Sequence, residues 1–316
     1  MTPNSDQQSS DQRTRGALAI FIGAGVWGLF WIPLRHLTNY GLEGLWAVAV
    51  TLAVPLLLIL PLTIRRIIRH ADRNFVYLGL AIGLSVVLYF GGVLFSDVVR
   101  VVFLFYMLPI WTTILGRLIN GETIGLRKLV AIALALSGLY LLLGGGGDGA
   151  HGSGGGFGIP LPANIGDWFG LAAGILWASS LVLIRHNSGA DPVVNTIAPL
   201  VFGTPVAVVA ALLMWALAPD ISPPAPTMDN RLWFGLVFAG IFGLLVLVPS
   251  IYGQVWGARM VPSSTAALLT MIELITASVS AYLLIGTSLG PMALAGGVLI
   301  ACAAVLDLTA PIGENE

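Results

Sequence analysis

Long apolar runs separated by short polar segments make up most of this 316-residue chain. A helix needs about 20 mostly apolar residues to cross the hydrocarbon core of a bilayer. In lipid the backbone must form helices or a closed barrel, and the alternating strands that a barrel requires are absent. The pattern therefore predicts an all-α integral membrane protein with about ten transmembrane helices. The predicted spans are 17–36, 44–64, 74–95, 98–119, 126–143, 165–185, 193–217, 232–256, 262–285 and 289–308.

Basic residues gather on one side of the predicted membrane. Loops that remain in the cytoplasm carry more Lys and Arg than loops on the outer side. With a cytoplasmic N-terminus, eleven of the 14 Lys and Arg residues fall on the inner side. The remaining three, Arg35, Arg100 and Arg231, fall on the outer side. We therefore expect a multi-pass protein with both termini cytoplasmic.

The composition supports this class and excludes others. Hydrophobic residues make up 57% of the chain and charged residues 9%, against about 25% charged residues in a soluble domain. The net charge of −1 indicates no nucleic-acid partner. The single cysteine, Cys302, permits no intrachain disulfide. The first apolar run reaches helix length and lacks a small-residue cleavage site, which predicts a retained helix rather than a signal peptide.

The two halves of the chain repeat a sequence pattern. Trp27 precedes Arg35-His36 and Trp177 precedes Arg185-His186 at the same spacing, with an offset of 150 (177 minus 27). Residues 122–125 (Glu-Thr-Ile-Gly) likewise match residues 287–290 (Thr-Ser-Leu-Gly), with an offset of 165 (287 minus 122). The alternative, chance similarity between apolar segments, would not order both matches correctly.

Five helices per half is an odd number, so the second half should enter the membrane upside down. Inverted repeats commonly place the substrate site near the midplane, between the halves. The expected organisation is a disordered cytoplasmic N-terminus at 1–16, a first five-helix repeat at 17–143, a Gly-rich linker at 144–164, a second five-helix repeat at 165–308 and a cytoplasmic tail at 309–316.

Two further stretches carry a resemblance. One runs from Phe105-Tyr106-Met107-Leu108-Pro109-Ile110-Trp111 to Asn120-Gly121-Glu122, and the other from Pro262-Ser263-Ser264-Thr265 to Glu273-Leu274. They resemble the fourth and ninth helices of the drug/metabolite transporter superfamily, EamA-type. The sequence departs from the family pattern where Gly286-Thr287 replaces a common Gly-Glu, and where Leu274 replaces a proline.

The resemblance covers about residues 17 to 308. It implies ten helices, a location in the cell inner membrane, and a central cavity lined by the first four helices of each half. It also implies export or exchange of small metabolites, with no cofactor and no ATP hydrolysis. Some members of the family export amino acids, including aromatic ones, and others handle nucleotide-sugars or drugs.

Glu273 is the most informative single residue. It lies eleven positions after Pro262 (273 minus 262), near the middle of the predicted ninth helix. A charge at that depth costs about 2.5–3.5 kcal/mol on insertion scales, so such residues usually face a cavity or a partner. Glu273 is therefore predicted to be a substrate-amine or proton site. The alternative is a protonated glutamate that forms a hydrogen bond between helices.

Arg100 and Asp97 lie three residues apart at the start of the predicted fourth helix. By the repeat alignment, Arg100 takes the place of the smaller Thr265. It could reach the outer mouth of the cavity and bind a carboxylate. The alternative is an arginine that extends to the lipid headgroups, with or without Asp97 as its partner.

Five more residues are candidates for the substrate site. Trp27 and Trp177 occupy matching positions in the two halves and could stack on a flat substrate, although single aromatic residues in membrane helices often only pack. Tyr89 and Tyr106 are weaker candidates of the same kind. Gln254 aligns with Tyr89 at the offset of 165 and could form a hydrogen bond with a substrate or with a neighbouring helix.

The chain shows no pattern typical of an enzyme. The four histidines lack metal-ligand spacing, and neither a P-loop nor a Gly-x-Ser-x-Gly motif is present. The predicted function is a secondary transporter, an exporter or exchanger of small metabolites such as amino acids, that works by alternating access around a midplane cavity. The alternatives are a membrane-embedded receptor or assembly subunit without transport activity, and a membrane-embedded transferase.

The expected partners follow from this function. They are a small-molecule substrate and the lipid bilayer, with no nucleic acid, no metal and no cofactor. A homodimer is compatible with the sequence.

Overall fold

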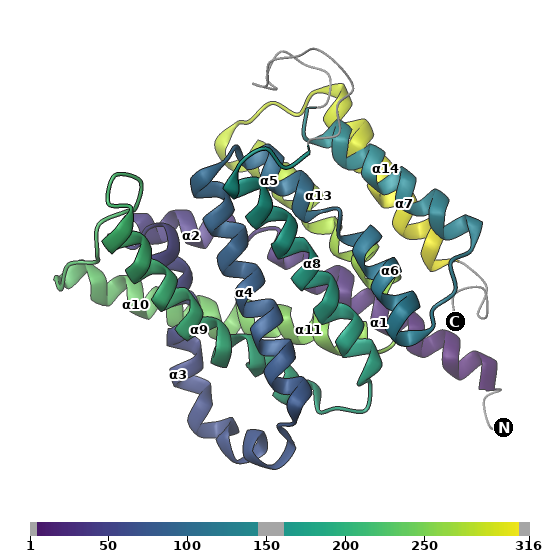
Figure 1. The fold of residues 1–316 in the computed structure, drawn as a ribbon, viewed down its shortest axis with the longest axis horizontal. Helices are drawn as coiled ribbons and strands as arrows, with labels where there is room; N and C mark the ends of the chain where they lie inside the picture. Colours follow the sequence, from purple (N-terminus) through teal and green to yellow (C-terminus); the bar gives the residue numbers. More distant parts are fainter. Residues whose placement is uncertain (1–4, 145–160, 310–316) are drawn as a thin grey trace.

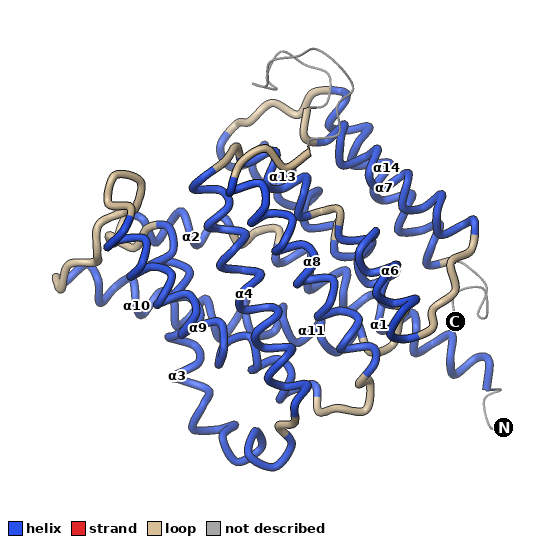
Figure 2. Tube along the Cα trace, in the orientation of Figure 1, coloured by secondary structure: helices blue, strands red, loops and turns tan. Residues whose placement is uncertain are grey.

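The protein is a bundle of helices (Figures 1 and 2). The computed structural model describes residues 5–144 and 161–309, and no strand occurs among them. Most of the predicted linker and tail, residues 145–160 and 310–316, lies outside this part of the chain. The helices of the first half are α1 (Ser5–Trp27), α2 (Trp31–Thr38), α3 (Gly44–His70), α4 (Arg73–Phe95), α5 (Val98–Phe105), α6 (Leu108–Asn120) and α7 (Leu126–Leu142). Those of the second half are α8 (Ile165–His186), α9 (Pro192–Leu217), α10 (Asn230–Phe242), the π-turn η1 (Gly243–Leu247), α11 (Val248–Ala258), α12 (Ser263–Thr270), α13 (Ile272–Ile285) and α14 (Pro291–Leu308).

These helices form ten segments. Nine segments of the described chain are long and apolar enough to cross a membrane. The tenth is α7, which has 17 residues and spans about 26 Å at 1.5 Å per residue, slightly less than the hydrocarbon core. The predicted all-helical membrane fold is confirmed.

The N-terminal segment differs from its prediction. Residues up to Gly16 were expected to be disordered, yet α1 begins at Ser5 and runs without interruption into the apolar helix. Adding a residue to an existing helix avoids the cost of nucleation, and Gln, Arg and Asp tolerate helical geometry. The apolar helix therefore extends into the polar segment that precedes it.

The packing of the two halves has an approximate twofold symmetry. In the first half α1 packs against α11, and the corresponding helix of the second half, α8, packs against α4. The contact of α3 with α9 joins corresponding helices directly, and α6 contacts α12, which belongs to the corresponding fourth segment of the second half. The last helices of the two halves, α7 and α14, lie side by side at the edge of the bundle (Figure 1).

Single hydrogen bonds repeat the same symmetry. The hydroxyl of Ser85 on α4 donates to the carbonyl oxygen of Ala173 on α8 over 2.8 Å. The hydroxyl of Ser250 on α11 donates to the carbonyl oxygen of Gly23 on α1 over 2.6 Å. Ser250 follows Ser85 by 165 positions (250 minus 85), and Ala173 follows Gly23 by 150 (173 minus 23). The two sequence offsets thus describe one three-dimensional relation.

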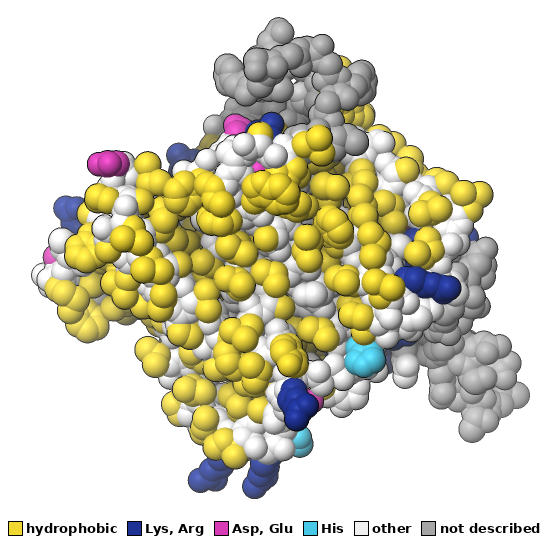
Figure 3. All heavy atoms as spheres, viewed as in Figure 1, with side chains coloured by type: hydrophobic (Ala, Val, Ile, Leu, Met, Phe, Trp, Pro, Cys, Tyr) yellow, Lys and Arg dark blue, Asp and Glu magenta, His cyan; other side chains and the backbone are white. Residues whose placement is uncertain are grey.

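The exterior suits a lipid environment. Large apolar side chains such as Leu62, Leu118 and Leu283 are more than 70% exposed. In the space-filling view hydrophobic side chains cover the middle of the face, and charged side chains lie toward its edges (Figure 3). A soluble protein seldom exposes an apolar surface this large.

One ion pair joins α3 to the start of α9. Asp191 caps α9 by accepting a hydrogen bond from the backbone N–H of Val193 at 2.9 Å, and it pairs with Arg66 at 2.5 Å. Burial alone would raise the pKa of Asp191, but these two bonds hold it below its usual value. Asp191 therefore stays ionised at neutral pH and fixes the loop between α8 and α9 against α3.

Candidate functional site

Interruptions in four transmembrane segments mark the middle of the bundle. The first is the turn between α1 and α2, and the second is the break at Tyr106 between α5 and α6. The third is the π-helix η1 between α10 and α11, and the fourth is the break at Met271 between α12 and α13. The breaks at Tyr106 and Met271 are 165 positions apart (271 minus 106), so they are corresponding positions of the two halves. Transporters commonly build their substrate site where transmembrane helices are discontinuous.

A narrow cavity, with about 30 Å³ of free interior space, lies between the two halves. Helices α1, α3 and α4 of the first half and α8, α9 and α11 of the second half contribute its walls. These are the first three segments of each half. The residues that line it are Trp27, Leu52, Ile82, Gly83, Val86, Trp177, Ser180, Leu181, Ile184, Pro199, Ile251, Gln254 and Val255.

The two corresponding tryptophans meet in this cavity. The ring centroids of Trp27 and Trp177 are 6.0 Å apart and the ring planes are tilted by 51°. Trp27 also stacks on Phe30, at 5.1 Å between centroids. Phe105 lies 6.2 Å from Trp177. The cavity wall therefore continues into a connected group of aromatic rings.

Glu273 lies beyond this aromatic group. It occupies the first turn of α13, directly after the break at Met271, and is 8% exposed. Its Oε1 accepts a hydrogen bond from the hydroxyl of Tyr106, at the corresponding break of the first half. Phe105 connects this pair to the cavity, since its ring lies 5.0 Å from Tyr106 and also contacts Trp177.

Gly28, directly after α1, allows the α1–α2 turn to lie close to Glu273. A Cβ atom on Gly28 would lie 2.3 Å from the carbonyl oxygen of Glu273 and 1.9 Å from the hydroxyl of Thr276. Only glycine permits the α1–α2 turn to approach α13 this closely. The first segment of one half therefore packs directly on the carboxylate-bearing turn of the other.

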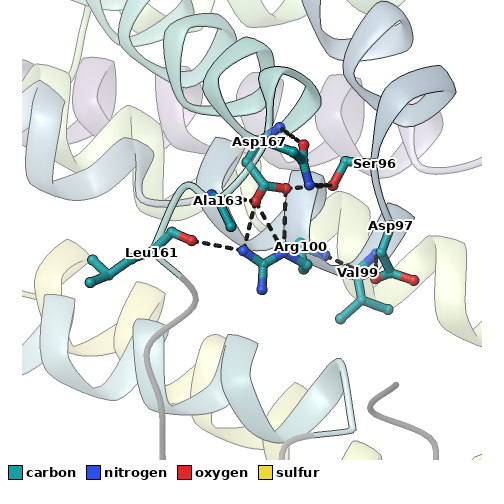
Figure 4. Close-up of polar contacts among 8 residues, drawn as sticks. Ser96, Asp97, Val99, Arg100, Leu161, Ala163 and Asp167 are labelled. Atoms are coloured by element: carbon teal, nitrogen blue, oxygen red, sulfur yellow. Dashed lines mark hydrogen bonds and ion pairs between the residues drawn. The ribbon is translucent and has the colours of Figure 1, made fainter. Parts of the chain in front are cut away.

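Arg100 does not line the cavity. It lies at the end of the bundle that contains Leu161, Ala163 and the start of α8, which we call the linker end (Figure 4). Its Nη2 is 2.6 Å from Oδ2 of Asp167 on α8 and 2.7 Å from the carbonyl oxygen of Leu161. Asp167 is fully buried and also accepts hydrogen bonds from the backbone N–H of Ala163 at 2.9 Å and the hydroxyl of Ser96 at 2.5 Å. The contacts of Asp167 thus join Ser96 at the end of α4 and Arg100 on α5 to the start of α8.

Asp97 caps helix α5, whereas Asp167 is the ion-pair partner of Arg100. Its Oδ1 accepts hydrogen bonds from the backbone N–H groups of Val99 and Arg100, at 2.9 and 3.3 Å. It is therefore the N-cap of α5. The sequence analysis did not consider Asp167, although a lone acidic residue in the first turn of an apolar helix was a signal for it.

Comparison with known proteins agrees with this architecture. The profile of the EamA-like transporter family matches residues 14–144 and again residues 164–309. The chain belongs to the EamA-like transporter family. Its two matched regions make the molecule a pair of repeated halves, and membership makes it a multi-pass transport protein rather than an enzyme.

A solved structure shares the fold of this EamA-like transporter. Its title reads "Crystal structure of protein", its sequence is 16% identical, the TM-score is 0.67, and the alignment covers 93% of this chain and 96% of that one. At this identity the likeness concerns the fold alone. No curated protein matches the sequence.

The predicted site residues of the transporter fall into three groups. Trp27, Trp177 and Gln254 line the cavity. Glu273 and Tyr106 form a hydrogen-bonded pair behind the aromatic rings, and Tyr89 packs beside them, 5.0 Å from Phe105. Arg100 belongs to the network at the linker end.

The Arg100–Asp167 pair leads to a stability prediction. Asp167→Asn removes the ionic partner of a partly buried guanidinium, and breaking a buried pair costs about 3–5 kcal/mol. Because the Arg100 side chain is 31% exposed, we expect the free energy of unfolding to fall by about 3 kcal/mol or less. The measurement is the melting temperature of the purified protein in detergent.

The control replaces both partners. A double variant, Arg100→Met with Asp167→Leu, leaves no charge unpaired and should recover most of the lost stability. An Asp167→Asn protein that melts like the wild type would show that the pair contributes nothing to the fold.

Proposed function

We propose that this protein is a secondary transporter, an exporter or exchanger of small metabolites, that works by alternating access. The supporting observation is the position of the cavity. It lies between the two halves and takes its walls from the first three segments of each. Two repeated halves that share one cavity can open it to either side in turn by rocking against each other.

Polar contacts between the halves support this mechanism. At the linker end Arg100 of α5 holds Asp167 of α8. At the opposite end Glu122, which follows α6, accepts hydrogen bonds from the backbone N–H and the hydroxyl of Ser263 at the start of α12, at 2.9 and 2.7 Å. Opening either end would require the contacts at that end to break while those at the other end hold.

The orientation belongs to the same proposal. The excess of Lys and Arg supports an orientation in which the end of the bundle that contains Glu122, and with it both chain termini, faces the cytoplasm. The linker end then faces outward, and the second half is inverted relative to the first. The mechanism needs no second copy, because helices of a single chain surround the cavity.

Glu273 is the residue to which we assign coupling or charge recognition. It is ionisable, it is buried near the middle of the bundle, and its partner Tyr106 belongs to the other half. Such a carboxyl group can bind either a proton or the amine of a substrate. Amino acids, which the family resemblance suggests, would use the second possibility.

Counterflow in proteoliposomes tests the transport proposal. Liposomes containing the purified protein are loaded with an unlabelled solute, and uptake of the labelled solute is followed with amino acids, nucleobases and nucleosides. We expect transient accumulation of at least one class, and none in protein-free liposomes. Absence of counterflow for all of them would favour the alternative, a membrane-embedded receptor or assembly subunit.

A further inference from the structure

The cavity between the two halves has an unusual lining for a site that would hold an amino acid. Among its described lining residues none carries a charged side chain. Apart from the two indole rings, the polar groups are the hydroxyl of Ser180 and the carboxamide of Gln254. Ser180 donates its hydroxyl hydrogen to the carbonyl oxygen of Trp177 at 2.7 Å. Gln254 is therefore the polar side chain with hydrogen-bonding capacity to spare.

Gln254 is buried without a partner for its acceptor. It is 6% exposed, and its Oε1 accepts no hydrogen bond from the described residues. A buried polar atom without a partner is energetically costly. In an apolar cavity that cost is recovered when a bound molecule brings the missing donor.

A glycine on α1 leaves room for the Gln254 side chain. A Cβ atom on Gly23 would lie 3.1 Å from Cγ of Gln254 and 2.7 Å from the carbonyl oxygen of Ser250. The absence of that atom gives the Gln254 stem its space between α11 and α1. Gln254 thus lines the same cavity as Trp27 and Trp177.

The charged groups of the core are engaged elsewhere. Glu273 does not line the cavity and already accepts the hydroxyl hydrogen of Tyr106. Arg100 is paired with Asp167 at the linker end. A zwitterion in the cavity would bury an ammonium and a carboxylate against apolar walls, which costs several kcal/mol for each ion that lacks a partner.

We propose that the cavity accepts an uncharged planar heterocycle whose edge carries an N–H donor next to a carbonyl acceptor, with the carboxamide of Gln254 as its hydrogen-bonding partner. This proposal rests on the proposed transport function and narrows its substrate class, away from amino acids. A carboxamide offers one acceptor and two donors side by side, so it pairs with such an edge through two hydrogen bonds, as glutamine does with a base edge.

The aromatic residues suit the same class. The faces of Trp27 and Trp177 are inclined to each other at 51°, and flat rings gain from stacked or tilted contacts with indoles. Because the edge carries both a donor and an acceptor, it matches the carboxamide in either of its two orientations.

The test compares two probes and two proteins by direct binding in detergent. Uracil carries the required edge, and 1,3-dimethyluracil has the same ring without N–H donors. The proteins are the wild type and Gln254→Leu, which keeps the bulk of the side chain and removes the carboxamide. We expect the wild type to bind uracil about tenfold or more tightly than 1,3-dimethyluracil, because a site built to form hydrogen bonds rejects an analogue that lacks them.

In Gln254→Leu the preference between the probes should disappear. The ratio of two affinities measured on one protein is insensitive to how much of the preparation is folded, so a partly unstable variant still gives the answer. A preference that survives in Gln254→Leu would overturn the proposal, as would failure of the wild type to bind uracil.

Counterflow with uracil and with labelled tryptophan separates this proposal from the transport function. Accumulation of uracil without tryptophan supports both. Binding of uracil without any transport supports the site and counts against the transporter. Accumulation of tryptophan without uracil supports the transporter and overturns the proposed substrate class.

Discussion

Glu273→Gln is expected to abolish net transport driven by a pH gradient while leaving the protein folded. Glutamine is nearly isosteric with glutamate, and its carbonyl oxygen can still accept the hydrogen bond from Tyr106. The substitution therefore removes the ionisable group alone. We expect a reduction of about tenfold or more in net uptake, because intramembrane carboxyl groups of transporters commonly carry the proton or the charge of the substrate.

Two assays on this variant separate the two roles of Glu273. If the carboxyl group binds the coupling proton, Glu273→Gln should lose uptake driven by a pH gradient but retain counterflow, since exchange of substrate needs no net proton movement. If it binds a substrate amine, both assays should fail. The uncharged substrate that we infer from the cavity leads us to expect the first pattern.

Tyr106→Phe is the matched control. It removes the hydroxyl that donates to Glu273 and keeps both the ring beside Phe105 and the carboxyl group. Gradient-driven uptake should fall less than in Glu273→Gln, because the ionisable carboxyl group remains in place. Wild-type rates in both assays for Glu273→Gln would leave Glu273 with a purely structural role.

The sequence was sufficient to predict the fold because its signals are long and periodic. Runs of about 20 apolar residues exceed what a soluble protein uses, and the structure contains the ten expected segments. The two offsets, 150 and 165, were taken from short motifs, yet they also relate Ser85 to Ser250 and Ala173 to Gly23 in space. A repeat alignment carries such three-dimensional information because residues at matching positions pack against matching helices of the other half.

The candidate site was less accessible from the sequence. Trp27 and Trp177 could be paired because they repeat, and the structure brings their rings to 6.0 Å. The partner of Arg100 could not be predicted, because Asp167 lies 67 positions away and the pairing depends on how α5 crosses α8. Tyr89 and Gln254 share an alignment position, but of the two only Gln254 lines the cavity, so the repeat alone does not identify the lining residues.

Helix breaks were the least predictable feature. The interruptions at Tyr106 and Met271 have no proline or glycine at the break itself. Proline does follow the first break, at Pro109 in the opening turn of α6, and glycine occurs within η1 at Gly243. Backbone groups freed at such points must find partners in neighbouring helices, so the breaks depend on tertiary packing more than on local propensity.

The twofold relation gives the second large prediction, that leucine at Gly92 or at Gly257 prevents the two halves from packing. The residues correspond at the offset of 165 (257 minus 92). A Cβ atom on Gly92 would lie 2.9 Å from the carbonyl oxygen of Gly166, and one on Gly257 would lie 2.4 Å from that of Gly16. Gly166 and Gly16 are themselves related by 150 positions (166 minus 16).

The obstacle in each case is backbone, which cannot rotate out of the way. Overpacking in a core costs about 1–3 kcal/mol when side chains can adjust, so we expect a larger loss of stability for these leucines. Membrane helices approach closely through small residues, and a leucine here separates α4 from α8 or α1 from α11. The measurements are the melting temperature and the yield of monodisperse protein in detergent.

Gly189→Leu is the control, because a Cβ atom there would meet no atom within 4 Å. It should behave like the wild type. Comparable losses at Gly92 and Gly257 would mean that the two halves depend equally on these corresponding helix crossings. A large drop in melting temperature at one position and none at the other would mean that the two crossings contribute unequally to stability, although their backbones are related by symmetry. Wild-type melting for both leucine variants would contradict the close packing of these helices.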